Sequence, residues 1–443
     1  MFLSSPGNSV NDHCSLLAQL DCQTFLGELP LPPVVQSIQA TRPMRLVELP
    51  TLDFWLGDGK IPIYPFKKSF SEARLDPVVA LHSSGTTGTP KLIIPKHGSY
   101  STLDSFQLVP LLHGQPCQPH DWRGKRVFVS FGWYHGAGLL PLLYMAIYYD
   151  YISVSVPAAA KITPEIVNDV HAYGSVDISL LAPSILMSIW RNPSWLDQLN
   201  YLKLVTYTGG PLPPAAGAAI STKTRLTHLF GSTETGLMAA EDVGTEDWQY
   251  FKFTPFLNFE FRPFEDGVFE LVMKRDSRFV AFQGVFHTFP DLQEFSMKDL
   301  FIRHPTKEGL WRSYGRTDNV IVFTDARKLN PAAMEAVLES HHAIEAALLC
   351  GDAKPQAALL VEPVTYPSTD TERDSLMCDV WEAAEQAMQV GPTSGKLSRD
   401  LVMITAPQKP LKRAGKGTVQ RVKSLDLYQE DIEKLFADFE KSH

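Results

Sequence analysis

The amino-acid sequence predicts an α/β protein in which a large layered N-terminal domain precedes a small α+β domain. Three observations support this fold class. Strand-like and helix-like runs alternate over residues 76–225, an aromatic-rich segment of alternating polarity follows at 250–273, and the pattern starts afresh after Arg316. The 443 residues allow two or three domains with a large core. We therefore expect an N-terminal domain over residues 1–317 and a C-terminal domain over residues 318–443.

The first domain is predicted to hold sheets with helices on both faces. Its first 50 residues combine short apolar runs with several prolines, and we expect βα pieces joined by extended connections. The clearest strands beyond them are 126–131 and 151–156, and the clearest helices are 182–191 and 213–220. The alternating segment, with a turn at 265–267, predicts a small antiparallel region.

The second domain is predicted to mix strands and helices. Strands are expected at 320–324, 346–350 and 357–361, and helices at 331–340, 372–390 and 425–441. The linker between the two domains is expected near residues 316–319.

Composition excludes several classes of protein. A formal net charge of −9 argues against nucleic acid or an anionic membrane as the main partner. The longest apolar stretch, 138–149, is too short to span a bilayer, and the start of the chain lacks the pattern of a signal peptide. The five cysteines form no CxxC pair, so we expect reduced thiols in a cytoplasmic protein without a zinc site.

The segment from His82 to Lys91, HSSGTTGTPK, is the most informative of the chain. It follows an apolar run and combines glycines, which let the backbone approach a polyanion, with hydroxyls and a lysine that donate to phosphate oxygens. An ordinary P-loop is disfavoured, because Pro90 precedes the lysine and Leu92 follows it. Alone, such a cluster is more often a simple turn.

Three later segments of the sequence make a functional interpretation of residues 82–91 more specific than a simple turn. In chain order, residues 82–91, 230–236, 314–318 and 413–421 resemble the signature segments of the adenylate-forming superfamily, which holds acyl- and aryl-CoA ligases, luciferases and the adenylation domains of non-ribosomal peptide synthetases. The nearest resemblance is to the adenylation domains of fungal synthetase-like reductases. It implies that the chain uses ATP and Mg²⁺ to join a carboxylate to the α-phosphate of ATP, with release of pyrophosphate.

The resemblance also assigns roles to individual residues. It places Ser83, Ser84, Thr86, Thr87, Gly88 and Lys91 in the loop that holds the phosphates. Around the adenine it places Phe230, Gly231 and Ser232 on one side and Gly209, Gly210 and Pro211 on the other. Thr233 and Glu234 match the pair at the α-phosphate, with Thr86 and Glu234 as ligands of Mg²⁺, whose preference for oxygen they suit.

Four further positions complete the implied site. Asp299 matches the aspartate that binds the ribose hydroxyls, although Met297-Lys298 replaces the usual Thr-Gly before it. Arg316 matches an arginine on the ribose and phosphate side, and Asp318 the hinge between two orientations of the small domain. Lys416, in a Gly-flanked basic loop, matches the lysine that bridges carboxylate and α-phosphate. The alternatives are a surface aspartate for Asp299, an ordinary linker charge for Asp318 and a solvated lysine for Lys416.

His135 is the residue from which we predict the class of carboxylic acid that the chain activates. By resemblance it borders the carboxylate pocket, where amino-acid-activating domains place an aspartate that pairs with the substrate ammonium. A histidine supplies no such anchor, so we expect an aryl, α-keto or aliphatic acid rather than an α-amino acid. Residues 139–143, 182–184 and 237–239 are the expected walls; a structural core histidine is the alternative reading.

The chain departs from the family pattern in two places. The lead-in before the Gly-rich loop is shorter than in relatives, so a homodimer or a partner is expected to cover that region. Ala326 stands where relatives have a glycine, in the turn that lines the pantetheine approach. We therefore expect transfer of the acyl group to a pantetheine thiol less firmly than formation of the adenylate.

The acceptor and the activity both stay open. No carrier or reductase region is expected after Arg421, so the acyl group would pass to a free thiol such as CoA, to an amine or alcohol, or to a carrier protein on another chain. The alternative is a degenerate adenylation domain that binds nucleotide or acyl ligand, or a partner, without full catalysis.

Overall fold

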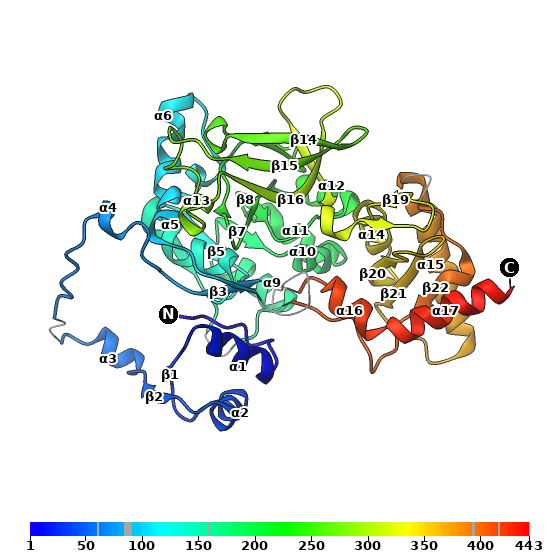
Figure 1. Ribbon diagram of the computed structural model, residues 1–443, viewed down its shortest axis with the longest axis horizontal. Coiled ribbons are helices and arrows are strands. Elements are labelled where there is room, and N and C mark those ends of the chain that lie inside the picture. Colours follow the sequence, from blue (N-terminus) through cyan, green and yellow to red (C-terminus); the bar gives the residue numbers. More distant parts are fainter. Residues whose placement is uncertain (60–61, 84–90, 158–159, 392–394, 415–416, 443) are drawn as a thin grey trace.

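The chain folds into a larger N-terminal part and a smaller C-terminal part that lie side by side (Figure 1). The computed structural model describes residues 1–59, 62–83, 91–157, 160–391, 395–414 and 417–442. We call residues 1–316 the large part and residues 320–442 the small part. The predicted α/β class is confirmed: both parts combine sheets and helices.

A five-stranded parallel sheet forms the centre of the large part, in the order β6-β5-β7-β8-β9. Alternate residues of its strands enter different hydrophobic clusters: Val127 and Val129 of β5 pack in one cluster, and Phe128 packs in the other. Both faces are therefore covered, which explains why the strands read as continuous apolar runs. The strands are β5 (Arg126–Val129), β6 (Ile152–Val154), β7 (Ile178–Leu181), β8 (Leu204–Tyr207) and β9 (Arg225–His228).

Four helices pack against the sheet in the cluster that contains Phe128. Each begins with a proline, which has no N–H to leave unbonded in a first turn and whose fixed φ suits it. They are α9 (Pro164–Tyr173), α10 (Pro183–Trp190), α11 (Pro193–Gln198) and α12 (Pro214–Ser221).

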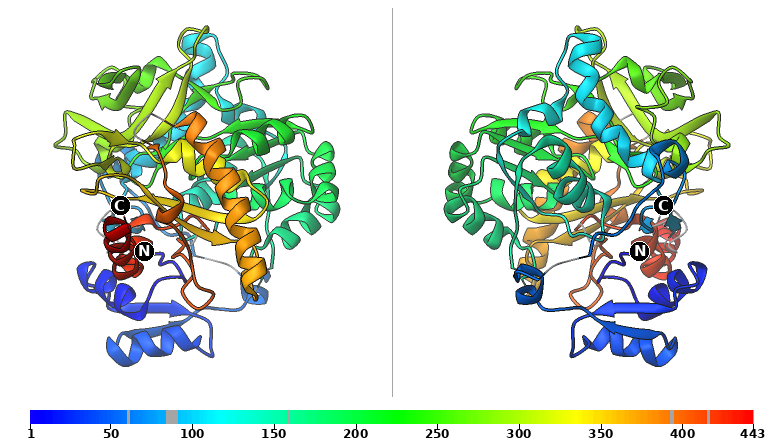
Figure 2. Two further views of the ribbon diagram at one scale, coloured as in Figure 1. Left: turned by 90° about the vertical axis from the view of Figure 1, so that its right-hand side faces the viewer. Right: turned by 90° about the vertical axis from the view of Figure 1, so that its left-hand side faces the viewer.

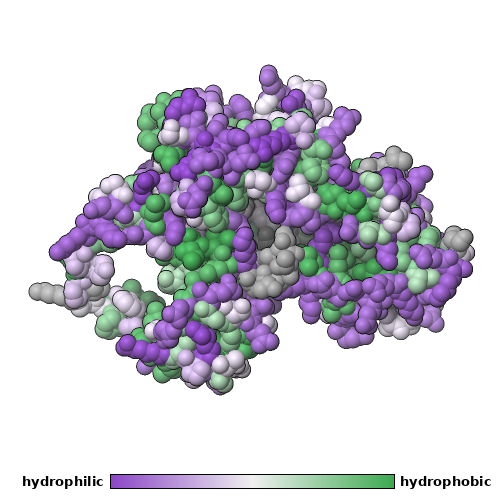
Figure 3. All heavy atoms as spheres, in the orientation of Figure 1, coloured by the Kyte–Doolittle hydropathy of each residue, from purple (hydrophilic) through white to green (hydrophobic). Residues whose placement is uncertain are grey.

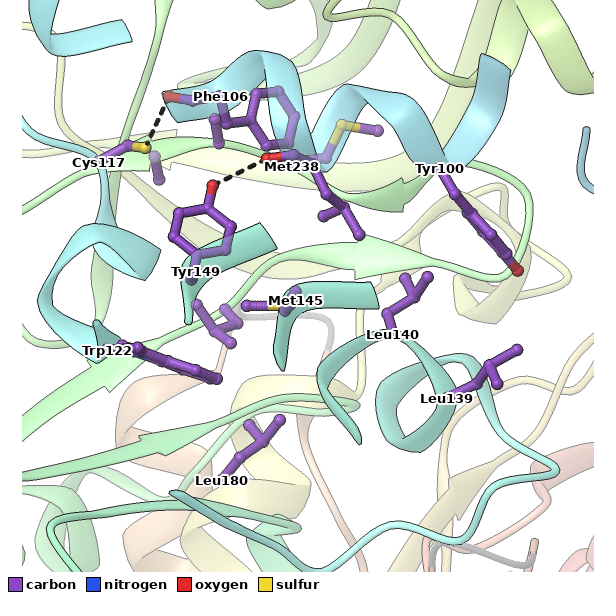
Figure 4. Close-up of a cluster of buried hydrophobic side chains, with 14 of the residues drawn as sticks. Tyr100, Phe106, Cys117, Trp122, Leu139, Leu140, Met145, Tyr149, Leu180 and Met238 are labelled. Atoms are coloured by element: carbon purple, nitrogen blue, oxygen red, sulfur yellow. Dashed lines mark hydrogen bonds between the residues drawn. The ribbon is translucent and has the colours of Figure 1, made fainter. Parts of the chain in front are cut away.

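The largest cluster lies on the other face of the sheet (Figure 4). Tyr149 donates from its hydroxyl to the carbonyl of Leu103 at 2.9 Å, and the Cys117 thiol lies 3.6 Å from the carbonyl oxygen of Phe106. Its elements include β3 (Leu81–Ser83), α5 (His97–Ser105), α6 (Val109–His113), α7 (Gly136–Leu139), the π-helical segment Leu140–Met145 and α8 (Ala146–Tyr149). β3 pairs with β4 (Lys91–Ile93). None of the described helices is long and apolar enough to cross a membrane.

The antiparallel region is larger than predicted, since six strands pair in the order β12-β13-β17-β16-β15-β14. Distant segments complete it, because β16 and β17 come from sequence beyond the predicted meander. Its strands β14, β15 and β16 carry an ion-pair network of Arg262, Lys274, Glu260 and Glu294. Figure 3 shows a largely hydrophilic surface over this upper end of the molecule. The elements are β12 (Ala240–Glu241), β13 (Tyr250–Phe253), β14 (Phe259–Glu265), β15 (Val268–Lys274), α13 (Val285–Thr288), β16 (Glu294–Arg303) and β17 (Trp311–Arg316).

The small part has its own hydrophobic cluster, drawn from β18–β22, α14 and α15. The single predicted helix at 425–441 is wrong: two helices meet at Tyr428, whose buried ring and hydroxyl, which accepts from the amide of Ala406 at 3.1 Å, fix a non-helical residue there. The elements are β18 (Ile321–Val322), β19 (Lys328–Leu329), α14 (Ala332–Ser340), β20 (Ile344–Cys350), β21 (Ala358–Pro363), α15 (Asp370–Val390), β22 (Val402–Ile404), α16 (Arg421–Leu427) and α17 (Gln429–Ser442).

The first 50 residues form βα pieces, as predicted, and the N-terminal portion lies along one side of the molecule (Figure 2). Large apolar side chains are exposed from Leu46 to Phe70, among them Phe54 and Trp55 of α3, and Figure 3 shows hydrophobic atoms on this N-terminal portion. The elements are α1 (Val10–Gln19), β1 (Thr24–Gly27), α2 (Pro33–Thr41), β2 (Arg45–Glu48), α3 (Leu52–Leu56) and α4 (Phe70–Ala73).

Candidate functional site

Asp299 and Arg316 face each other on neighbouring strands of the antiparallel sheet. They are register partners on β16 and β17, and a guanidinium nitrogen lies 3.3 Å from a carboxylate oxygen. Arg316 also donates to both carboxylate oxygens of Asp318, at 2.9 and 3.0 Å. The predicted ribose-binding aspartate, the predicted arginine and the predicted hinge residue thus form one connected group.

Burial dominates the electrostatics of this group. It raises the pKa of Asp299 to about 6, because the attraction of Arg316 only partly offsets the lost hydration, and Asp318 and Glu234 repel further negative charge. The influence of Glu234 on both Asp299 and Arg316 places its carboxylate in the same neighbourhood. The structure therefore brings together three of the predicted site residues from three separate segments.

The unusual residue before Asp299 has a structural explanation. Lys298 has a φ of 58°, in the left-handed region that glycine adopts at no steric cost. The resemblance placed a glycine at this position. The chain thus keeps the bend without the glycine, at the cost of some backbone strain.

Thr233 and Glu234 stand at the tip of a short hairpin. β10 (Gly231–Ser232) pairs with β11 (Gly236–Leu237), and the buried Thr235 bonds with the hydroxyl of Ser232 at 3.0 Å. A Cβ on Gly231 would lie 2.4 Å from the carbonyl oxygen of Gly236, so the close pairing requires glycine. The turn leaves Thr233 and Glu234 half-buried.

The two predicted adenine-binding strips follow neighbouring parallel strands. Gly209, with a φ of 91°, follows β8, and Phe230 follows β9; the hydroxyl of Thr208 donates to the carbonyl of Leu229 at 2.8 Å and ties the strand ends together. The carboxyl ends of parallel strands are where α/β proteins bind ligands. Phe230 is half-buried and packs against Phe251, Phe253 and Phe301, so its ring has a fixed place.

The predicted phosphate loop is described only at its ends. Ser83 and Lys91 are register partners of the β3–β4 hairpin, and Lys91 is exposed. His82 next to them accepts from the amide of Ser5 at 3.1 Å. The predicted residues Ser84, Thr86, Thr87 and Gly88 lie outside the described residues.

His135 caps the N-terminus of α7. Its Nδ1 accepts from the amide of Ala137 at 3.0 Å, and its ring stacks on Phe131 with centroids 5.8 Å apart. An accepting Nδ1 leaves the proton of a neutral imidazole on Nε2, where it is a donor. A Cβ on Gly138 would lie 2.2 Å from the carbonyl oxygen of Gly132, so the loop before the helix must pass very close to it.

The basic loop of the small part reaches the large part. Around Gly417, which has a φ of 86°, the chain turns back so that the amide of Ala414 donates to the carbonyl of Thr418 at 2.8 Å. A Cβ on Gly417 would lie 2.8 Å from Ser184 Oγ, and one on Gly210 would lie 3.9 Å from the Thr418 methyl carbon. Lys416 itself is outside the described residues, but its described neighbours lie against a predicted pocket wall and a predicted adenine strip.

Sequence reasoning missed the contacts that join the two parts. Arg191, at the end of α10, donates to groups of α14 and β20, and no local motif marks it.

Arg421, the last residue of the fourth signature segment, pairs with Glu335 and donates to the carbonyl of Leu349 at 2.6 Å. Arg421 thus stabilises the small part from within.

Comparison with protein families agrees with the geometry. The model of AMP-binding enzymes matches residues 29–255, and the model of the C-terminal domain of AMP-binding enzymes matches residues 318–440. The chain is 34% identical over 441 residues to the isocyanide synthase–NRPS hybrid crmA of Aspergillus fumigatus and 31% identical over 451 residues to a carboxylic acid reductase of Neurospora crassa. These alignments cover 98% and 100% of this chain, which spans 28% and 42% of the two relatives.

Solved structures show the same fold. The anthranilate CoA ligase AuaEII in complex with anthranoyl-AMP superposes with a TM-score of 0.72 at 15% identity, covering 98% of this chain and 83% of the ligase. The McyG A-PCP structure with phenylalanyl-adenylate gives 0.70 at 14% identity, covering 98% of this chain and 70% of that one. With these two family matches and two relatives more than 30% identical over nearly its whole length, the chain belongs to the AMP-binding enzymes of the adenylate-forming superfamily, alongside fungal adenylate-forming reductases.

Proposed function

We propose that this chain is an adenylate-forming ligase that activates a carboxylic acid with ATP. The observation that carries the proposal is the Asp299–Arg316 pair, on which the charge of Glu234 acts, and the described ends of the basic loop support it by lying beside Ser184 and Gly210. We further propose that residues 1–317 and 318–443 act as two domains, the second of which delivers Lys416 to the first.

The reaction requires charge stabilisation more than acid–base catalysis. A carboxylate oxygen of the acid attacks the α-phosphorus, a P–O bond forms, and the bond from the α-phosphorus to the bridging oxygen of pyrophosphate breaks. Fixed cationic donors stabilise the charge that develops on the phosphate oxygens. In this proposal Asp299 holds the ribose, Arg316 lies on its phosphate side, and Lys416 bridges the two reacting groups.

Mg²⁺ fits the residues around the hairpin tip. Among the described residues no three His, Cys, Asp or Glu side chains gather as a self-sufficient metal site. Mg²⁺ is commonly held by one or two carboxylates together with the phosphates of its nucleotide. Glu234 would supply the carboxylate, with Thr86 as the second proposed protein ligand, and the ion would neutralise phosphate charge when bound.

The substrate is proposed to be an aryl, α-keto or aliphatic acid. His135 stands at the position where an ammonium-binding carboxylate would be needed for an α-amino acid, and its Nε2 proton suits a carboxylate instead. The anthranoyl-AMP bound by the structural neighbour is an aryl example. The acyl group would then pass to CoA, a carrier protein, an amine or an alcohol, and a partner or second copy would cover the exposed apolar residues between Leu46 and Phe70.

Acid-dependent exchange of labelled pyrophosphate into ATP, across a panel of carboxylic acids, tests the proposal. We expect exchange with at least one acid of these classes. Lys416→Ala should abolish it without loss of folding, whereas Lys412→Ala, an exposed lysine of the same loop, should retain it. ATP binding without exchange for any acid would favour the alternative of a nucleotide-binding protein, and full exchange by Lys416→Ala would refute the role of that lysine.

A further inference from the structure

One short helix of the large part contacts the small part at both of its ends. The N-terminal end of α10 holds Ser184, which lies beside Gly417, and Pro183, which lies beside Gly210. The C-terminal end is followed by Arg191, whose guanidinium reaches α14 and β20. A helix of eight residues is about 12 Å long, so the two contacts are separated by a rigid spacer.

The guanidinium of Arg191 fills the corner where α14 ends and β20 begins. One terminal nitrogen donates to the carbonyls of Glu339 and Ile344, at 3.2 and 2.6 Å, and the other donates to the carboxylate of Glu345 at 2.9 Å. The carbonyl of Glu339 is one of the last of α14, which have no partner within the helix and carry its negative dipole end. A planar, permanently charged donor suits such a set of acceptors, because it serves several of them at fixed angles.

Other charged contacts between the two parts are weaker. Lys423 and Asp12 are 4.0 Å apart and partly exposed, where an ion pair contributes little. Lys328 lies over the ring of Phe264, 5.1 Å from its centroid. The Arg191 side chain is only 22% exposed and bonds to backbone as well as to a side chain, so its position defines the orientation of α14 directly.

We propose that Arg191 is a positioning residue for acid activation. This inference rests on the proposed function. By holding the α14–β20 corner at one end of α10, Arg191 fixes the small part in the orientation in which the basic loop lies at the other end, against Ser184 and Gly210. Arg191 acts through the orientation of the small part, because it bonds with the Glu339 and Ile344 carbonyls and the Glu345 carboxylate. If the small part rotates away from this orientation, the three hydrogen bonds of Arg191 to Glu339, Ile344 and Glu345 must break.

The test compares Arg191→Ala, Arg191→Lys and Glu345→Gln. The control is Arg278→Ala, which removes an exposed arginine whose ion pair with Asp276 lies wholly in the large part. We would measure pyrophosphate exchange, the affinity for AMP, the melting temperature, and the radius of gyration by small-angle X-ray scattering.

We expect Arg191→Ala to lower kcat of exchange by about tenfold or more while the KM for ATP and the affinity for AMP stay within about twofold, because fewer molecules occupy the competent orientation. Its radius of gyration should increase. Arg191→Lys should be intermediate, since an ammonium cannot serve the whole acceptor set. Glu345→Gln should lose less than Arg191→Lys, because both carbonyl bonds remain, and Arg278→Ala should match the wild type.

Two results would overturn the inference. One is an Arg191→Ala variant with wild-type kcat and wild-type scattering. The other is a parallel loss of kcat, AMP affinity and melting temperature, which indicates a general structural role. If Arg191→Ala does not fold, the comparison of Arg191→Lys with Glu345→Gln decides: equal activities would contradict the proposal. If the wild type itself exchanges with no acid, the proposed function fails, and scattering of the variants still shows whether Arg191 fixes the orientation.

Discussion

Asp299 and Arg316 are register partners on β16 and β17, and their charged groups are 3.3 Å apart. The pair lies at the end of the antiparallel sheet from which the chain continues into the small part. Because Arg316 also bonds with Asp318, the residue proposed to bind ribose is linked by two ion pairs to the residue proposed as the hinge.

The affinity for adenosine should fall at acidic pH. The pKa of Asp299 is about 6, so its carboxylate is the main form at pH 8, and at pH 5 only about a tenth remains ionised. The ribose hydroxyls donate to the ionised form, so binding should weaken by up to about tenfold between pH 8 and pH 5. Adenosine is the suitable probe, because it has no phosphate that titrates in this range. Calorimetric titration of the wild type and Asp299→Asn measures the effect; the variant should bind weakly at every pH. Equal affinity of the wild type for adenosine at pH 5 and pH 8 would contradict the ribose role.

Ala326→Gly should stabilise the small part. Ala326 has a φ of 65° in the turn between β18 and β19, where a Cβ is strained and glycine is not. The gain should be about 0.5–1 kcal/mol, since the relief of strain exceeds the entropy that glycine adds to the unfolded chain. Differential scanning calorimetry measures it. Ala332→Gly, in the first turn of α14, is the matched control and should destabilise by about 1 kcal/mol.

Two neighbouring glycines of α7 should respond oppositely to alanine. A Cβ at Gly138 would lie 2.2 Å from the backbone oxygen of Gly132, so Gly138→Ala should cost about 2 kcal/mol or more and displace the loop that holds His135. A Cβ at Gly136 meets nothing within 4 Å, and Gly136→Ala should be neutral or stabilise by up to about 1 kcal/mol. Chemical denaturation of both variants checks the contrast. Equal stability of the two would show that the loop does not pass as closely as described.

Glu339→Gln should stabilise the protein at alkaline pH. Burial, and then repulsion from Glu335, raise the pKa of Glu339 from an ordinary 4.5 to about 8, with Glu345 adding to the rise and Arg191 opposing it. Between these two values the folded chain holds a proton that the unfolded chain has lost, so stability contributed at low pH is lost as pH rises toward 8. Glutamine resembles the protonated form, and the variant should exceed the wild type by about 4 kcal/mol at pH 8 but by only about 1 kcal/mol or less near pH 5. Denaturation at both pH values gives this difference, and a difference that does not change with pH would contradict the assignment.

Local sequence was sufficient for most of the elements that were predicted individually. Prolines at the starts of α10 and α12 and the apolar run of β5 define these elements by short-range chemistry, and each lies within a few residues of its predicted place. The terminal helix was predicted wrongly, because Tyr428 interrupts it through contacts with the distant residues Ala406 and Lys409. The spacing of apolar residues along a helix contains no information about contacts with residues so far away in the sequence.

The candidate site likewise has features that the sequence predicted and features that only the tertiary structure shows. By itself the sequence determined the signature segments, the glycines that permit close approach and the residue types suited to a nucleotide, since these depend on short stretches of chain. Only the tertiary structure decided that Asp299 pairs with Arg316 near Glu234, that Gly417 lies beside Ser184, and that Arg191 joins the two parts. These contacts bring together residues far apart in sequence, and they form only when the packing of both hydrophobic clusters compensates for the entropy lost in closing such long loops.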